Sequence, residues 1–129
     1  MNKMVNEQYH ILVIDDNEDI LFMIKAMLEM KGYKVTPKNH PENIELVIET
    51  IMPDIILMDM LLSGADGREV CKKIKTNAVI SKIPVIMISA LPDAGDSCMA
   101  AGANYFLGKP FEINDIFKTV ATALVPVMI

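Results

Sequence analysis

The stretch ILVIDDNEDI, residues 11–20, sets four apolar residues directly before two aspartates and the start of a segment with helical spacing. A short apolar run rich in Ile and Val is typical of a strand that helices cover on both faces, as happens in parallel sheets. We therefore predict a buried strand at residues 11–14, a turn that carries two carboxylates, and then a helix.

Similar apolar runs recur along the chain and predict the rest of a sheet. The clearest cover residues 55–58 and 84–88, a weaker one covers residues 105–107, and a fifth strand is expected around residues 33–36. No apolar run approaches the roughly 18 residues that are needed to span a bilayer.

Segments with helical spacing separate these runs. The first presents an apolar stripe made of Ile20, Ile24, Met27 and Leu28. A second helix is expected to open at Pro41, which suits the first helical position, and to end before Pro53. The first helix is expected to cover residues 18–31, and the third, fourth and fifth to cover residues 66–75, 93–101 and 112–124. Strands and helices that alternate with short connections predict an α/β fold, a doubly wound five-stranded parallel sheet with right-handed crossovers.

The composition indicates one acidic globular domain. The 129 residues are 52% apolar and 22% charged, which suits a single hydrophobic core. The formal net charge of -5 argues against nonspecific binding to nucleic acids or anionic membranes, which requires clustered Lys and Arg. Residues 1–10 lack the apolar stretch of a signal peptide, and Cys71 and Cys98 lack the spacing of a zinc or redox motif. We therefore expect a cytoplasmic protein with reduced thiols.

Polar residues gather where the predicted strands end. Asp15 and Asp16 follow the first strand and Asp59 ends the third. Ligands of doubly wound sheets bind beyond these strand ends, and adjacent buried carboxylates stay ionised only with a compensating cation. Mg²⁺ suits carboxylates, water and a phosphoryl oxygen. The alternative is that Asp15 and Asp16 only cap the following helix, because Asp favours that position.

Two further strand ends add a hydroxyl and an ammonium group to these acids. Ser89 closes the fourth strand, and Lys109 follows the fifth. Phosphoryl transfer to a carboxylate needs a nucleophilic oxygen, a metal that neutralises developing charge, and donors for the phosphoryl oxygens. Alone, Ser89 and Lys109 would be an ordinary strand end and a solvated loop charge, so the combination carries the prediction.

Four motifs, in this order, resemble the receiver domain of two-component response regulators. They are ILVIDDNEDI (11–20), PDIILMDMLLSGADG (53–67), IPVIMISA (83–90) and GANYFLGKPF (102–111). The resemblance covers about residues 10–124 and implies a flavodoxin-like (βα)5 sheet with strand order 2-1-3-4-5. It also implies that residues 1–129 form a single receiver domain without an output domain.

The resemblance implies a role for each site residue. Asp59 would be the phosphoacceptor and a ligand of Mg²⁺, Asp16 a direct Mg²⁺ ligand, Asp15 a ligand through water, and the carbonyl of Leu61 would complete the set. Ser89 would then hydrogen-bond the aspartyl phosphate.

The resemblance also implies roles for Lys109 in charge neutralisation and for Phe106 in the conformational change that follows phosphorylation. Lys109 would pair with a phosphoryl oxygen, and Phe106 would turn inward together with Ser89 when the phosphate is present. Core packing alone is the alternative role of Phe106.

The implied function is a phosphorylation-dependent signalling switch rather than an enzyme, although such a domain assists its own phosphorylation and dephosphorylation. The donor would be a histidine kinase or a histidine phosphotransfer protein. The signal would pass through the face formed by the fourth helix, the last strand and the fifth helix to an unknown downstream protein. We expect no direct nucleic-acid or membrane partner, and a monomer or a weak phosphorylation-dependent homodimer.

The chain departs from the family pattern at several positions. Ser63 stands where the family usually has proline, and Asn104 and Tyr105 replace an acidic pair. Two other functions stay open: a phosphorylation-independent interaction module, and a slow aspartate-based phosphohydrolase. The second class places an acid two residues after the nucleophile, where this chain has Leu61.

Overall fold

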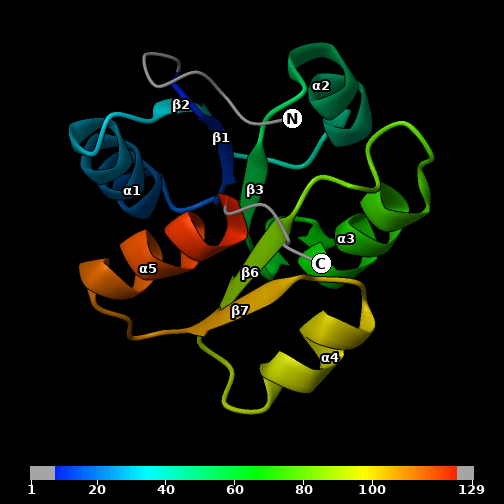
Figure 1. Ribbon diagram of the computed structural model, residues 1–129. Coiled ribbons are helices and arrows are strands. Elements are labelled where there is room, and N and C mark those ends of the chain that lie inside the picture. Colours follow the sequence, from blue (N-terminus) through cyan, green and yellow to red (C-terminus); the bar gives the residue numbers. More distant parts are fainter. Residues whose placement is uncertain (1–7, 125–129) are drawn as a thin grey trace, which may run out of the picture.

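A parallel sheet forms the centre of the computed structural model, which describes residues 8–124 (Figure 1). Its strand order is β2-β1-β3-β6-β7, which is the predicted order 2-1-3-4-5 once a separate two-stranded hairpin is set aside. The five strands are β1 (His10–Ile14), β2 (Lys34–Lys38), β3 (Ile55–Asp59), β6 (Val85–Ser89) and β7 (Tyr105–Gly108). The predicted fold class is therefore confirmed.

Helices cover both faces of this sheet. Figure 1 shows α1 and α5 on one side, and α2, α3 and α4 on the other. Their bounds are α1 (Glu18–Met30), α2 (Ile44–Ile51), α3 (Gly67–Thr76), α4 (Ala94–Ala100) and α5 (Ile113–Leu124). Within the described residues, no helix is long and apolar enough to cross a membrane.

Alternate residues of the strands belong to two separate apolar clusters, because successive side chains of a strand point to opposite faces of the sheet. In β1, Ile11 and Val13 join the cluster under α1 and α5, whereas Leu12 and Ile14 join the cluster under the other three helices. All four are essentially inaccessible to solvent. Strand β1 is thus packed on both faces, which fixes the position of its carboxyl end.

The hairpin was not predicted from the sequence. It consists of β4 (Leu61–Leu62) and β5 (Ala65–Asp66), which pair antiparallel across Ser63 and Gly64. Gly64 has a φ of +76°, a conformation that suits glycine in a tight turn. The hairpin directly follows β3, so it lies beside the end of the strand that carries Asp59.

Two predictions about α2 and β2 were wrong in detail. Pro41 does not open α2, which begins at Ile44 after a turn in which Asn43 is left-handed with a φ of 56°. Asn tolerates that region better than most residues. The second strand lies at residues 34–38 and includes Pro37, which is accommodated because β2 is an edge strand.

The predicted inner stripe of α1 was partly wrong. Ile24 and Leu28 are buried as expected, but Leu21 completes the buried set, while Ile20 and Met27 are only half-buried. The helix is thus rotated slightly from the stripe that the sequence suggested.

Candidate metal and phosphorylation site

The predicted site residues come from four neighbouring strands. Asp15 directly follows β1, Asp59 is the last residue of β3, Ser89 is the last residue of β6, and Lys109 directly follows β7. These strands are adjacent and parallel, so their carboxyl ends meet at one edge of the sheet. The structure therefore brings these residues to the place where doubly wound sheets bind ligands.

The three aspartates form a compact cluster. One carboxylate oxygen from each of Asp15, Asp16 and Asp59 lies within 4.8 Å of the others. Asp15 is 2% exposed and Asp59 is 7% exposed, while Asp16 is half-buried. Burial raises the pKa of Asp15, the nearby Asp59 and Asp16 charges raise it further, and the Asn17 N–H and Lys109 oppose them. Its ionised form is therefore costly in this setting.

The cluster fits a hard divalent cation. Asp15 Oδ2 is buried and has no hydrogen-bond partner among the described residues. Lys109 Nζ lies 4.0 Å from this oxygen. Three carboxylates face one ammonium group, so a cation bound by oxygen would neutralise the excess charge and occupy the orphaned oxygen.

The Asp59 carboxylate is held on both sides. Its Oδ1 lies 2.9 Å from Lys109 Nζ, and its Oδ2 accepts a 3.1 Å hydrogen bond from the Leu61 N–H. Lys109 is held in turn, since its backbone N–H donates to the Ser89 carbonyl at 2.8 Å. A carboxylate is thus fixed beside a cationic group, and such a group can pair with phosphoryl oxygens.

Ser89 and Phe106 occupy different surroundings. The Ser89 side chain is buried, and its Oγ accepts a 3.0 Å hydrogen bond from the Leu91 N–H. It lies one residue beyond Ile88, which pairs with Asp59 across the sheet. Phe106 is half-buried, pairs with Met87 and packs against the apolar cluster under α2, α3 and α4. The structure thus places Ser89 at the site and Phe106 behind it.

The alternative role of the first two aspartates, capping of α1, is wrong. Asn17 caps the helix, because its side chain accepts hydrogen bonds from the N–H groups of Asp19 and Ile20. Asp15 instead accepts a 2.9 Å bond from the Asn17 N–H, and its other oxygen faces the site. The two aspartates are therefore available for a cation.

Sequence reasoning missed two contributors from the hairpin region. Ser63 Oγ donates a 2.7 Å hydrogen bond to Asp16 Oδ2. A Cβ at Gly67 would lie 2.6 Å from the Asp59 carbonyl oxygen, so only glycine lets α3 start against the end of β3. The glycine was visible in the sequence, but nothing local indicates the contact between Ser63 and Asp16, which are 47 positions apart.

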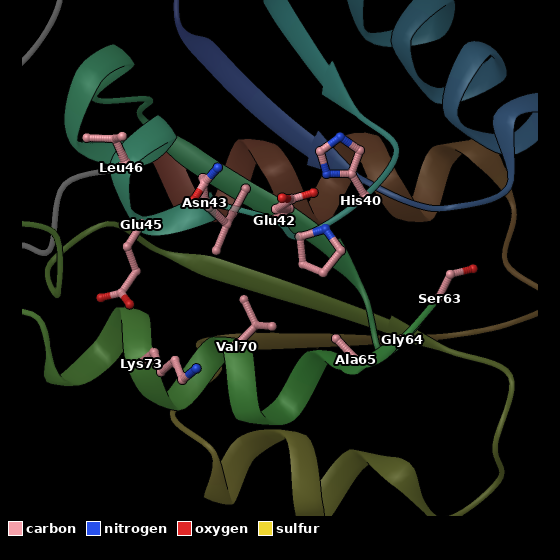
Figure 2. A pocket seen from close by; sticks show the side chains of 12 residues that line it. His40, Glu42, Asn43, Glu45, Leu46, Ser63, Gly64, Ala65, Val70 and Lys73 are labelled. Carbon is pink, nitrogen blue, oxygen red and sulfur yellow. The ribbon is translucent and has the colours of Figure 1, made fainter.

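A separate cavity of about 590 Å³ lies beside the site (Figure 2). It is bordered by α2, the hairpin and α3, and none of the three clustered aspartates lines it. Ser63 is shared, since it lines this cavity and also bonds Asp16. The cavity is therefore a neighbour of the acidic cluster and not its binding cleft.

Comparisons with known proteins agree with this geometry. The chain is 31% identical over 116 residues to the DNA-binding dual master transcriptional regulator RpaA of Synechocystis, covering 88% of this chain and 48% of that protein. It is 36% identical over 113 residues to the response regulator PleD of Caulobacter vibrioides, covering 85% of this chain and 25% of that protein. The chain thus spans half or less of the length of these relatives.

Two solved structures have a closely similar fold. A putative response regulator from Chloroflexus aurantiacus superposes with a TM-score of 0.87 at 30% identity, covering 92% of this chain and 98% of that one. The receiver domain of a sensor histidine kinase from Pseudomonas aeruginosa, solved with magnesium coordinated in its active site cleft, superposes with a TM-score of 0.83 at 28% identity, covering 92% and 98%.

The family comparison covers most of the chain. Residues 11–121 match the family described as the response regulator receiver domain. That span includes every strand end from which the acids, Ser89 and Lys109 arise. The chain therefore belongs to the receiver domain family of two-component response regulators.

Proposed function

We propose that this chain is a phosphorylation-dependent signalling switch that accepts a phosphoryl group on Asp59 from a histidine kinase or a histidine phosphotransfer protein. The observation that carries the proposal is the 2.9 Å pair between Asp59 and Lys109 inside a cluster of three carboxylates. It provides a nucleophile, a cationic partner and a cation site within one small volume. We place this activity in the cytoplasm.

In the proposed reaction, a carboxylate oxygen of Asp59 forms a bond to phosphorus while the nitrogen–phosphorus bond of the donor histidine breaks. The electron pair of that bond stays on the donor nitrogen. Lys109 is released from the Asp59 carboxylate and pairs with a phosphoryl oxygen. Asp15, Asp16, Asp59 and the Leu61 carbonyl would hold Mg²⁺, which would neutralise charge on the phosphoryl group.

The phosphorylated state gains interactions that the free state lacks. The aspartyl phosphate brings additional charge and strong acceptor oxygens close to Lys109 and Ser89. If Ser89 and Lys109 interact more strongly with the phosphate in one conformation than in the other, the difference in interaction free energy shifts the equilibrium toward that conformation. We propose that Phe106 follows this change and that the face made by α4, β7 and α5 transmits it.

Two rival functions are less well supported. An aspartate phosphohydrolase would need an acid two residues after Asp59, but Leu61 is there, and the cluster of the described residues holds three acids only. A phosphorylation-independent module would have no use for the buried, unpartnered oxygen of Asp15.

Intact mass spectrometry after incubation with acetyl phosphate and Mg²⁺ tests the proposal. We expect one added phosphoryl group in the wild type, and none in Asp59→Asn or without Mg²⁺. Asp54→Asn is the matched control, because Asp54 lies at the opposite end of β3, directly before Ile55, and it should be labelled normally.

Each rival function predicts a different result. Release of inorganic phosphate that depends on Asp59, without a lasting adduct, would establish the hydrolase. Neither an adduct nor phosphate release would establish the interaction module. Equal labelling of Asp59→Asn would show that the acceptor is another residue.

A further inference from the structure

We propose that Ser63 is a positioning residue of the cation site, whose hydroxyl fixes the Asp16 carboxylate for metal binding. The inference rests on the proposed function and adds a residue to it. The contact is a 2.7 Å hydrogen bond from Ser63 Oγ to Asp16 Oδ2. It joins the turn of the β4–β5 hairpin to the loop after β1, which are 47 positions apart in the chain.

The Asp16 carboxylate is half-buried and is held by a hydrogen bond from Ser63. Asp15 is buried and accepts from the Asn17 N–H, and Asp59 is held by the Leu61 N–H and by Lys109. Among the described residues, the Ser63 hydroxyl is the recorded hydrogen-bond partner of the Asp16 carboxylate. Without it, the half-buried Asp16 side chain would be free to turn toward solvent.

The bond leaves Asp16 able to bind a cation. A carboxylate has two oxygens, and Ser63 engages Oδ2 only, so Oδ1 stays available. A ligand that is already oriented loses less conformational freedom when the ion binds. Groups that hydrogen-bond metal ligands in this way typically change metal affinity about 10- to 100-fold when they are removed.

The residue type matters at this position. A residue without a side-chain hydroxyl, such as proline, cannot make the bond. The contact that holds Asp16 therefore needs a side-chain hydrogen-bond donor at position 63.

Ser63 can be changed without disturbing the core. It is exposed at the rim of the cavity beside the site. Figure 2 shows its hydroxyl directed away from the other labelled residues, such as Ala65 and Val70. Loss of the hydroxyl should therefore alter Asp16 while leaving the packing of α3 and the hairpin intact.

Calorimetric titration of the unphosphorylated full chain with Mg²⁺ tests the inference. We expect Ser63→Ala to weaken Mg²⁺ binding by about tenfold or more. Ser63→Thr keeps the hydroxyl and should restore most of the wild-type affinity. Ser81→Ala removes a hydroxyl from the loop before β6, at the opposite end of the sheet, and should bind Mg²⁺ like the wild type. In chelator, all four proteins should unfold at nearly the same temperature.

The outcomes separate this inference from the proposed function. If Ser63→Ala binds Mg²⁺ as tightly as the wild type or more tightly, or if Ser63→Thr is as weak as Ser63→Ala, Ser63 does not position Asp16. Phosphorylation of the wild type by acetyl phosphate would still stand in that case. A wild type that binds no Mg²⁺ and takes no phosphoryl group would overturn both.

Discussion

At the scale of single residues, Asp15 makes the site electrostatically costly in the absence of a cation. Burial raises its pKa, and Asp59 and Asp16 raise it too, against the Asn17 N–H and Lys109. An acid whose pKa in the folded state lies above its usual value of 3.8 favours folding most at a pH below 3.8. Its contribution is lost as the pH rises through the raised pKa.

Asp15→Asn should therefore stabilise the metal-free protein at neutral pH, because a neutral amide keeps the contact with the Asn17 N–H without the buried charge. We expect thermal unfolding in chelator to occur several degrees higher than in the wild type at pH 7. The difference should vanish below pH 3.8, where the Asp15 carboxyl is neutral in both states. Asp19→Asn, on the exposed side of α1, should give no such gain. A lower midpoint for Asp15→Asn at pH 7 would contradict this account.

The sequence placed Asp15, Asp16, Asp59 and Lys109 correctly, because parallel strands bring their carboxyl ends to one edge of a sheet. That reasoning needs only the strand positions. It could not find Ser63, whose role depends on a hairpin that turns it back toward the loop after β1. Residues whose contacts arise from loop geometry leave no periodic pattern.

At the scale of elements, α4 is tied to the rest of the molecule by a short polar link. Asp66 caps α3, and Arg68 binds Asp66 through Nε at 2.9 Å and Ser97 of α4 through Nη1 at 3.1 Å. Helix α4 itself is short and contains Gly95, and its N-cap residue, Asp93, makes no side-chain capping hydrogen bond. Its position therefore depends on such contacts from outside.

Arg68→Met should loosen α4, because it keeps the aliphatic stem but removes the side-chain hydrogen bonds to Asp66 and Ser97. We expect amide hydrogen exchange in residues 94–100 to become several-fold faster, with little change in β1 and β3. Lys72→Met is the matched control, since Lys72 lies on the same helix and its ion pair is with Glu69, also in α3. Equal exchange in both variants would show that the link does not hold α4.

The sequence predicted each helix and each strand of the large sheet, but the ends of some were wrong for local reasons. Pro41 suggested a helix start, yet the left-handed Asn43 delays α2 until Ile44. The strands of the hairpin are only two residues each, too short to show alternation. Long apolar periodicities are therefore reliable here, and turns between them are not.

At the scale of the whole molecule, the site and the proposed output face are linked through β6 and β7. The Ser89 carbonyl accepts from the Lys109 N–H, and Phe106 lies in β7 with its ring near Gly95 of α4. A Cβ at Gly95 would lie 3.5 Å from that ring, so a movement of Phe106 would change the packing against α4. Helix α2 covers the same face of the sheet but is separated from α4 by α3 (Figure 1), so we expect it to lie outside this path.

Phosphorylation should therefore change hydrogen exchange in α4, β7 and α5 while leaving α2 unchanged. In the proposed switch the aspartyl phosphate would attract the Ser89 hydroxyl and Phe106 would follow, so Ser89→Ala should accept phosphate but lose most of the exchange change. Exchange is measured with acetyl phosphate and Mg²⁺, on samples whose intact mass shows equal phosphorylation. Ser81→Ala should respond like the wild type, because Ser81 precedes β6 at its amino end. A response that persists in Ser89→Ala, or one that is as large in α2, would mean that the signal does not travel through Ser89 and Phe106.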